Sequence, residues 1–238
     1  MNARIFAVEL ADELRGIVRE PTALFFSIIM PVGFFTLFAS IFGGGNPGML
    51  ATFGTFGVLG VALMNPGVRI AQDRELGWLR AKRVSAVPIG VTLAAKVAAV
   101  LPYAIGVLLA MTAAAGLTGS LTASPVQVAR LIAVLLLGAL PFALLGLAVG
   151  FQAGSNAAVA ILNAILMPMS VLSGLWMPLA ILPAFFGTVA PFLPTYHLAA
   201  IATAQLAGGP VVGHALVLLG MTVVTGALAA VSYRHARP

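Results

Sequence analysis

Long apolar stretches without any charged residue alternate with short charged segments along this chain. No Asp, Glu, Lys or Arg occurs in residues 21–68, 97–129 or 131–233. A transmembrane helix needs about 20 apolar residues, and clusters of Gly, Pro and Asn divide these stretches into pieces of that length. The pattern predicts an all-α polytopic membrane protein with six transmembrane helices, at about 23–42, 49–68, 97–117, 125–150, 157–177 and 212–232.

The segment 178–210 is also apolar, but it is interrupted by Pro178, Pro183, Pro191 and Pro194. Each interior proline removes a backbone donor, and hydrocarbon offers no water to replace the lost hydrogen bond. We therefore expect a re-entrant helical hairpin, on the extracytoplasmic side and before the last span, rather than a straight span.

The first 22 residues predict an amphipathic helix that lies in the membrane interface. Phe6, Leu10, Leu14 and Ile17 are spaced four, four and three residues apart, which places them on one helical stripe. Charged residues, including Glu13, occupy much of the remaining surface. Such a helix anchors the chain, or it connects the first span to a partner on the cytoplasmic side.

Composition agrees with a membrane protein and excludes several other classes. The 238 residues are 61% hydrophobic and 8% charged, with no Cys, whereas soluble domains carry about 25% charged residues. A soluble enzyme and a disulfide scaffold are thereby excluded, and residues 1–238 are expected to form a single transmembrane domain.

The net charge of +6 follows the positive-inside rule and does not indicate a nucleic-acid partner. With six spans, 11 of the 12 Lys and Arg residues lie on one side, which is therefore the cytoplasm and holds both termini. Arg130 is the exception, one turn into the fourth span. We expect its head to reach the lipid phosphates, with a cargo contact as the alternative.

The loop 69–96 holds more kinds of side chain than are needed to set the membrane topology. Besides its basic residues it holds Asp73, Glu75 and an aromatic residue, Trp78, flanked by Leu76 and Leu79. A short charged helix that offers an aromatic anchor is typical of a docking surface. The alternative is a loop whose charges only set the topology.

The same loop resembles the first cytoplasmic loop of ABC exporter permeases of the type-2 class. The resemblance rests on Glu75-Leu76-Gly77-Trp78-Leu79-Arg80, then Arg83-Val84, Pro88-Ile89-Gly90 and Lys96. Trp78 stands where those loops usually have Thr, Ser85-Ala86-Val87-Pro88 replaces a Thr-Pro pair, and Ala95-Lys96 replaces Gly-Lys. A second match, Leu193-Pro194-Thr195-Tyr196-His197-Leu198 followed by Gln205-Leu206, looks like the segment before the last span of that family. The order of the parts agrees over the whole chain.

The resemblance implies a permease subunit in the bacterial cytoplasmic membrane, which pairs with a second permease chain, expected to be identical, and with two copies of an ABC-type ATPase. ATP and Mg would be bound by the ATPase and not by this chain. The coupling helix that docks on the ATPase would include Asp73, Arg74, Glu75, Trp78, Leu79, Arg80 and Arg83. A second, smaller contact would include Gln152, Ser155 and Asn156.

Several absences bear on the function. The chain has no Gly-x-x-x-x-Gly-Lys-Ser/Thr run, so it is not expected to hydrolyse ATP itself. No Asp or Glu lies in an expected span, which argues against a proton- or sodium-coupled carrier, although backbone carbonyls could bind sodium. An ATP-independent channel or carrier, and a membrane scaffold, remain as alternatives.

No catalytic or metal-binding residue is predicted. An intramembrane serine protease is not indicated, because Ser173 lacks the glycine expected two residues before such a serine, and His214 has no orienting carboxylate. His197, His214 and His235 are far apart in the sequence, without Cys or a nearby acidic residue.

Two patterns concern helix packing and the transport path. Gly146, Gly150 and Gly154 recur every four residues, which allows close helix contact. Asn163 and Ser170 continue the seven-residue spacing from Asn156, so they share one face of the fifth span, either as packing contacts or at the pathway or dimer seam. Six Phe residues in the first span favour a hydrophobic or amphipathic cargo, such as a drug-like molecule or a lipid.

Overall fold

The computed structural model describes residues 2–19, 25–42, 47–78, 81 and 88–236, and this part of the chain is helical and contains no strand. The prediction of an all-α polytopic membrane protein is confirmed. The longer helices are α1 (Asn2–Val18), α3 (Met30–Phe42), α4 (Pro47–Glu75), α6 (Ile89–Ala98), α7 (Val100–Leu117), α8 (Pro125–Gly138), α9 (Leu140–Gly150), α10 (Ser155–Leu172), α12 (Pro194–Ala207) and α13 (Val212–His235). Shorter pieces are the π-helix η1 (Phe25–Ile29), α11 (Ala184–Val189) and the 3₁₀ turns η2 (Leu179–Ile181) and η3 (Ala190–Phe192).

Five segments of the described chain are long and apolar enough to cross a membrane, and they match the second to sixth expected spans. They are Gly48–Glu75, Ile89–Leu117, Pro125–Gly150, Ser155–Leu172 and Val212–His235. The first expected span corresponds to the shorter apolar helix Met30–Ile41 together with η1. The pieces Ala184–Phe192 and Pro194–Ala207 meet at 93°, as a broken span or a re-entrant loop does, in the segment where prolines predict a break.

Local sequence explains where several helices begin and break. At the start of α8, the Gln127 amide N donates to Ser124 Oγ (3.3 Å) and the Ser124 amide N donates to Gln127 Oε1 (2.9 Å), which is a capping box. Within two spans the helix is interrupted at Ala99 and Ala139, shortly before Pro102 and Pro141. Proline cannot donate to the preceding turn, so both spans are divided into two helices.

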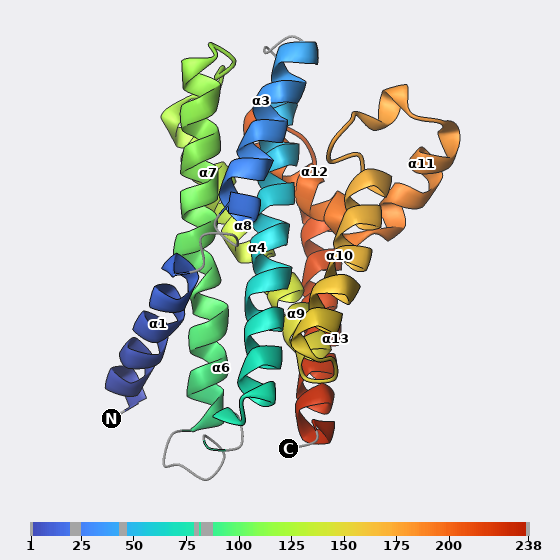
Figure 1. Cartoon of the computed structure of the whole chain (residues 1–238). Coiled ribbons are helices and arrows are strands. Elements are labelled where there is room, and N and C mark those ends of the chain that lie inside the picture. Colours follow the sequence, from blue (N-terminus) through green and yellow to red (C-terminus); the bar gives the residue numbers. More distant parts are fainter. Residues whose placement is uncertain (1, 20–24, 43–46, 79–80, 82–87, 237–238) are drawn as a thin grey trace.

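Helix α4 is the centre of the bundle. It packs against α9, α7, α10 and α12, and most side chains between Leu50 and Ala71 are buried. A helix surrounded in this way can be apolar on all sides, which agrees with its continuous hydrophobic sequence. Figure 1 shows α4 inside the bundle, α1 beside α6, and the hairpin that contains α11 projecting to one side.

Both ends of the loop after α4 are more helical than expected. Helix α4 continues to Glu75, and α6 begins at Ile89, so Lys96 lies inside a helix and not in a loop. At about 1.5 Å per residue, the 29 residues of α4 extend well beyond the hydrocarbon core of about 30 Å. Figure 1 places the end of α4, the start of α6 and both chain ends at the same end of the bundle, here called the charged end.

Candidate functional site

A buried lysine joins three helices near the charged end. Lys96 of α6 is 1% exposed, and its Nζ forms an ion pair with Glu13 of α1 and a second one, at 2.8 Å, with Asp73 Oδ2 of α4. Glu13 is 7% exposed, although the sequence suggested that it belongs to the polar surface of α1. The ion triad Glu13–Lys96–Asp73 therefore holds the N-terminal helix against the bundle.

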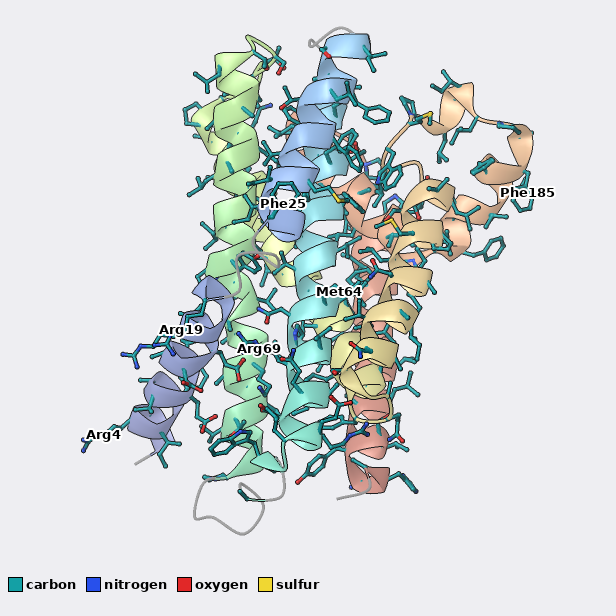
Figure 2. All side chains as sticks on the ribbon, viewed as in Figure 1. Arg4, Arg19, Phe25, Met64, Arg69 and Phe185 are labelled. Atoms are coloured by element: carbon teal, nitrogen blue, oxygen red, sulfur yellow. The ribbon has the colours of Figure 1, made fainter. Side chains whose placement is uncertain are left out.

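Arg69 supports the same contact one turn before Asp73. Its guanidinium lies directly against Gly16 of α1, where a Cβ would overlap it. In Figure 2, Arg69 lies between α4 and α1, whereas Arg4 and Arg19 point away from the bundle. Phe6, Leu10 and Leu14 of the expected apolar stripe are half-buried, and the side chain of Ile17 lies outside the described part.

The last turn of α4 binds the turn 151–154 before α10. Arg74 donates from Nη1 to the Phe151 carbonyl oxygen and from Nη2 to the Ala153 carbonyl oxygen, the latter at 2.8 Å. The Ser155 amide N donates to Glu75 Oε1 (2.9 Å), so the Glu75 carboxylate caps the positive end of α10. Gly154 makes this approach possible, because a Cβ there would lie 2.6 Å from Glu75 Oε1.

Electrostatics at this cap favour an ionised Glu75. The residue lies about ten Å beyond the expected span 49–68, at about 1.5 Å per residue, and its side chain is exposed. Hydrogen bonds from the Ser155 side chain and backbone lower the pKa of the Glu75 carboxyl below its usual value. The cap therefore remains charged at neutral pH.

Some residues of the two segments predicted separately to contact a partner bind each other. Gln152 Nε2 donates to the Ser232 carbonyl oxygen of α13 (2.8 Å), while Ser155 binds Glu75 of α4. The turn 151–154 thus connects α4, α10 and α13, and Asn156 in the first turn of α10 is exposed. A force applied to the end of α4 would reach all three helices.

Beyond Glu75 the chain turns at Gly77 and presents apolar side chains to the outside. Gly77 has a φ of 76°, which favours glycine, and the Ala81 amide N donates to the Gly77 carbonyl oxygen (3.0 Å). Leu76 is 72% exposed and Trp78 is 58% exposed. The predicted docking residues Leu79, Arg80 and Arg83 lie outside the described residues.

The predicted face of α10 is divided between two environments. Ser170 is fully buried and donates to the Leu166 carbonyl oxygen (2.7 Å), whereas Asn163 is half-buried and Nδ2 donates to the Val159 carbonyl oxygen (3.0 Å). Both side chains bind their own helix. Their place at a pathway or dimer seam stays a prediction.

The glycines predicted for close packing bring α4 and α9 into backbone contact. A Cβ at Gly146 would overlap the Leu63 carbonyl oxygen, and one at Gly150 would overlap the Gly67 carbonyl oxygen. In the reverse direction, a Cβ at Gly67 would lie 2.8 Å from the Gly146 carbonyl oxygen. The packing is therefore within one chain, and it fixes the position of α9 relative to the central helix.

A histidine pair that the sequence did not predict lies near the opposite end. Pro194 is the first residue of α12, and Tyr196 and His197 follow in its first turn. His197 Nε2–H donates to the Pro191 carbonyl oxygen (2.8 Å), and His197 Nδ1 lies 2.7 Å from His214 Nδ1 of α13. The Tyr196 ring packs on His214 with a centroid distance of 5.8 Å. In a neutral pair, the Pro191 contact leaves His197 Nδ1 as acceptor and His214 Nδ1–H as donor.

This geometry predicts a response to acid. If both rings carried a second proton, each of the facing Nδ1 atoms would hold an N–H, and their 2.7 Å contact would lose its acceptor. The groups around His214 are Tyr196, Thr52, Ser173 and Thr203, which line a cavity of about 370 Å³ with it, and the sequence has no Asp or Glu after Glu75 to compensate a second charge. We expect hydrogen exchange in 184–198 to increase several-fold between pH 7 and 5.

His214→Phe should make that exchange independent of pH, because a phenyl ring can place no N–H against His197 Nδ1. His235→Phe, at the exposed end of α13, is the matched control and should keep the response of the native chain. An unchanged exchange pattern in the native chain at pH 5 would refute the shared-proton geometry.

Comparison with known proteins assigns the chain to a protein family. The family model described as ABC-2 type transporter matches residues 6–207. This range includes the ion triad, the contacts of Arg74 and Glu75 with residues 151–155, and all of α12. The chain belongs to the ABC-2 type transporter family. It is also similar to a Bacillus subtilis (strain 168) protein named "Putative transport permease YvfS", with 25% identity over 204 residues and 83% of each chain covered.

The protein is thus a multi-pass membrane transport subunit, as predicted from the resemblance of its sequence to ABC exporter permeases of the type-2 class. In this ABC-2 permease, Asp73, Arg74 and Glu75 hold the charged end together, and Leu76 and Trp78 are exposed beside them. The matched region ends with α12, so the segment of Pro194, Tyr196 and His197 falls within the family domain.

Proposed function

We propose that this permease is the membrane subunit of an ATP-driven exporter and that its charged end docks on a separate ABC-type ATPase. The observation that carries the proposal is the exposed pair Leu76 and Trp78. The pair directly follows Arg74 and Glu75, whose contacts with residues 151–155 connect α4 to α10 and, through Gln152, to α13. Aromatic side chains on a supported surface are typical anchors of an interface. A partner that grips Trp78 would move the connected helices together.

The charge distribution supports a cytoplasmic orientation for this end. In the described part of the chain, charged side chains lie on α1, in the last two turns of α4, on α6 and at the end of α13, with Arg130 of α8 as the exception. The positive-inside rule then places both termini and the docking surface in the cytoplasm of a bacterial cell. That is the compartment where an ATPase partner finds ATP.

The contacts suggest how ATPase closure would become movement of the membrane helices. A push on Trp78 would pass through the last turn of α4 to the turn 151–154, and the glycine contact with α9 would carry it along the bundle. Two permease chains on two ATPase copies would then switch between two rigid arrangements. ATP and Mg would be bound by the ATPase alone.

The cargo follows from the apolar character of the chain. Residues 21–72 contain no Asp or Glu, and neither do residues 76–238, while Phe35, Phe38 and Phe53 form a packed aromatic group between α3 and α4. This apolar character favours a hydrophobic or amphipathic molecule as the cargo. Asn163 and Ser170 of α10 would lie near the path or near the seam between the two chains.

The test is affinity purification of the tagged chain from its native membrane, followed by mass spectrometry and assays of ATP-driven export. The native chain should retain an ABC-type ATPase, and Trp78→Ala should lose most of it. Leu117→Ala, an exposed apolar residue at the opposite end, is the matched control and should retain the ATPase. A chain that purifies alone and conducts its cargo without ATP would instead establish a channel or carrier.

Glu75→Ala separates docking from coupling. Loss of a helix cap costs about 1 kcal/mol, so the protein should fold and still bind the ATPase. Export per ATP hydrolysed should decrease, because α10 is no longer connected to the end of α4. Export at the native ratio would contradict the role of this contact.

A further inference from the structure

An apolar groove runs along one side of the bundle, separate from the docking surface. Its volume is about 720 Å³, which is in the range of sites for small molecules. One wall is formed by α6 and the start of α7, the floor by α8 and α9, and the other wall by α13. Lys96 points away from it, because its Nζ binds Glu13 and Asp73 on α1 and α4.

The groove is about as long as one leaflet of a membrane is thick. Its lining begins with Ile89 and Tyr233 at the charged end and reaches Leu101 and Leu136. From Ile89 to Leu101 the helix rises about 18 Å, at about 1.5 Å per residue, which is close to half of a hydrocarbon core of about 30 Å. Ala99 and Ala139, the two positions where the spans are interrupted, lie at the end of the groove that is farther from the charged end.

The groove opens toward the membrane and not into an aqueous path. Leu101, Leu137 and Leu140 belong to its lining and are 42%, 79% and 41% exposed in the isolated chain, within segments that cross the membrane. Among the residues that the structure describes, its lining includes no charged one. Hydrocarbon is therefore the material that meets its opening.

One end of the groove has Tyr233 in its lining and Arg234 next to it in the chain, and both residue types can bind a phospholipid head group. Tyr233 is the lining residue with a hydroxyl group, and it lies at the charged end, where Tyr commonly meets lipid head groups. The next residue, Arg234, is exposed and cationic. A chain seated in the groove would bring its phosphate to these two residues.

We propose that this groove binds one acyl chain of a phospholipid from the leaflet at the charged end, with the lipid phosphate beside Tyr233 and Arg234. The lipid fills the space between α6 and α13. Because the ion triad holds the opposite side of α6, the bound chain and the triad together fix the position of this helix. The site goes beyond the proposed export function and does not depend on an ATPase.

Native mass spectrometry of the purified full chain, prepared in phosphatidylglycerol or in phosphatidylcholine, tests the proposal. The native chain should retain one phospholipid after detergent washing that removes the surrounding lipid. Ala230→Phe fills the groove and should reduce retention roughly tenfold or more, because each buried methylene contributes to lipid binding. Ala227→Phe, an exposed residue of the same helix outside the lining, is the matched control and should retain the lipid.

A second variant on the other wall, Ala94→Leu, keeps the test valid if Ala230→Phe does not fold. Arg234→Gln should weaken retention of both lipids, since both carry a phosphate, and a diacylglycerol without phosphate should bind less than either. Retention that is the same in the filled variants would overturn the proposal. So would cross-linking of two chains through Ala230→Cys in this cysteine-free protein, because a second copy would then cover the groove.

Discussion

Replacing Lys96 by Met is expected to lower the stability of the permease by about 3–5 kcal/mol, because it removes the cation of a buried ion pair and leaves its partners in place. Lys96 is 1% exposed and is paired with Glu13 and with Asp73. Without the ammonium group, two carboxylates would face each other at a site with little access to water. Thermal unfolding in mild detergent, followed by the fluorescence of Trp78 and Trp176, measures the loss.

The control restores neutrality at the same site. Lys96→Met combined with Glu13→Gln and Asp73→Asn removes all three charges, and it should recover most of the lost stability because no unpaired charge remains. Arg4→Gln, on the exposed side of α1, should change the unfolding temperature little. A single Lys96→Met variant as stable as the native chain would refute the triad.

Replacing Gly150 by Ala should lower the free energy of unfolding by about 1–3 kcal/mol and should also impair transport. The added Cβ would overlap the Gly67 carbonyl oxygen and would meet Ile70 Cγ2, and backbone atoms cannot move aside as a flexible side chain can. Helices α4 and α9 would have to separate. The turn 151–154 follows Gly150 directly, so Arg74 and Glu75 would lose their partners there.

A glycine without close neighbours provides the comparison. A Cβ at Gly220 of α13 would meet nothing within 4 Å, so Gly220→Ala should be neutral or should stabilise its helix by up to about 1 kcal/mol. Both variants add the same methyl group to a membrane-spanning helix. Equal unfolding temperatures for the two would show that contact between α4 and α9 is not a constraint.

Hydrophobic pattern alone predicted most of the architecture, because a membrane requires a minimum length of apolar helix and proline limits where a helix can continue. The break in 178–210 followed from the prolines, and the start predicted for the fourth span, residue 125, is the first residue of α8. The helix ends at Glu75 and Ile89 did not follow from the pattern, since charged residues can continue a helix outside the hydrocarbon core.

The contacts of the site were harder to predict, because they join residues far apart in the sequence. Periodicity shows which residues share a face but not which neighbour that face meets. Glu13 could therefore be placed on the polar surface of α1, although in the structure it faces Lys96. The His197–His214 contact likewise crosses from α12 to α13, and no spacing within one helix reports it.

The ion triad also bears on the order in which the chain is assembled during synthesis. Glu13 and Asp73 are made before Lys96, and until α6 is inserted their two negative charges repel each other. The N-terminal helix can therefore form its ion pair with the bundle only after the third span, which carries Lys96, is present. The Glu13–Lys96 ion pair thus forms when the helices that α1 packs against are present.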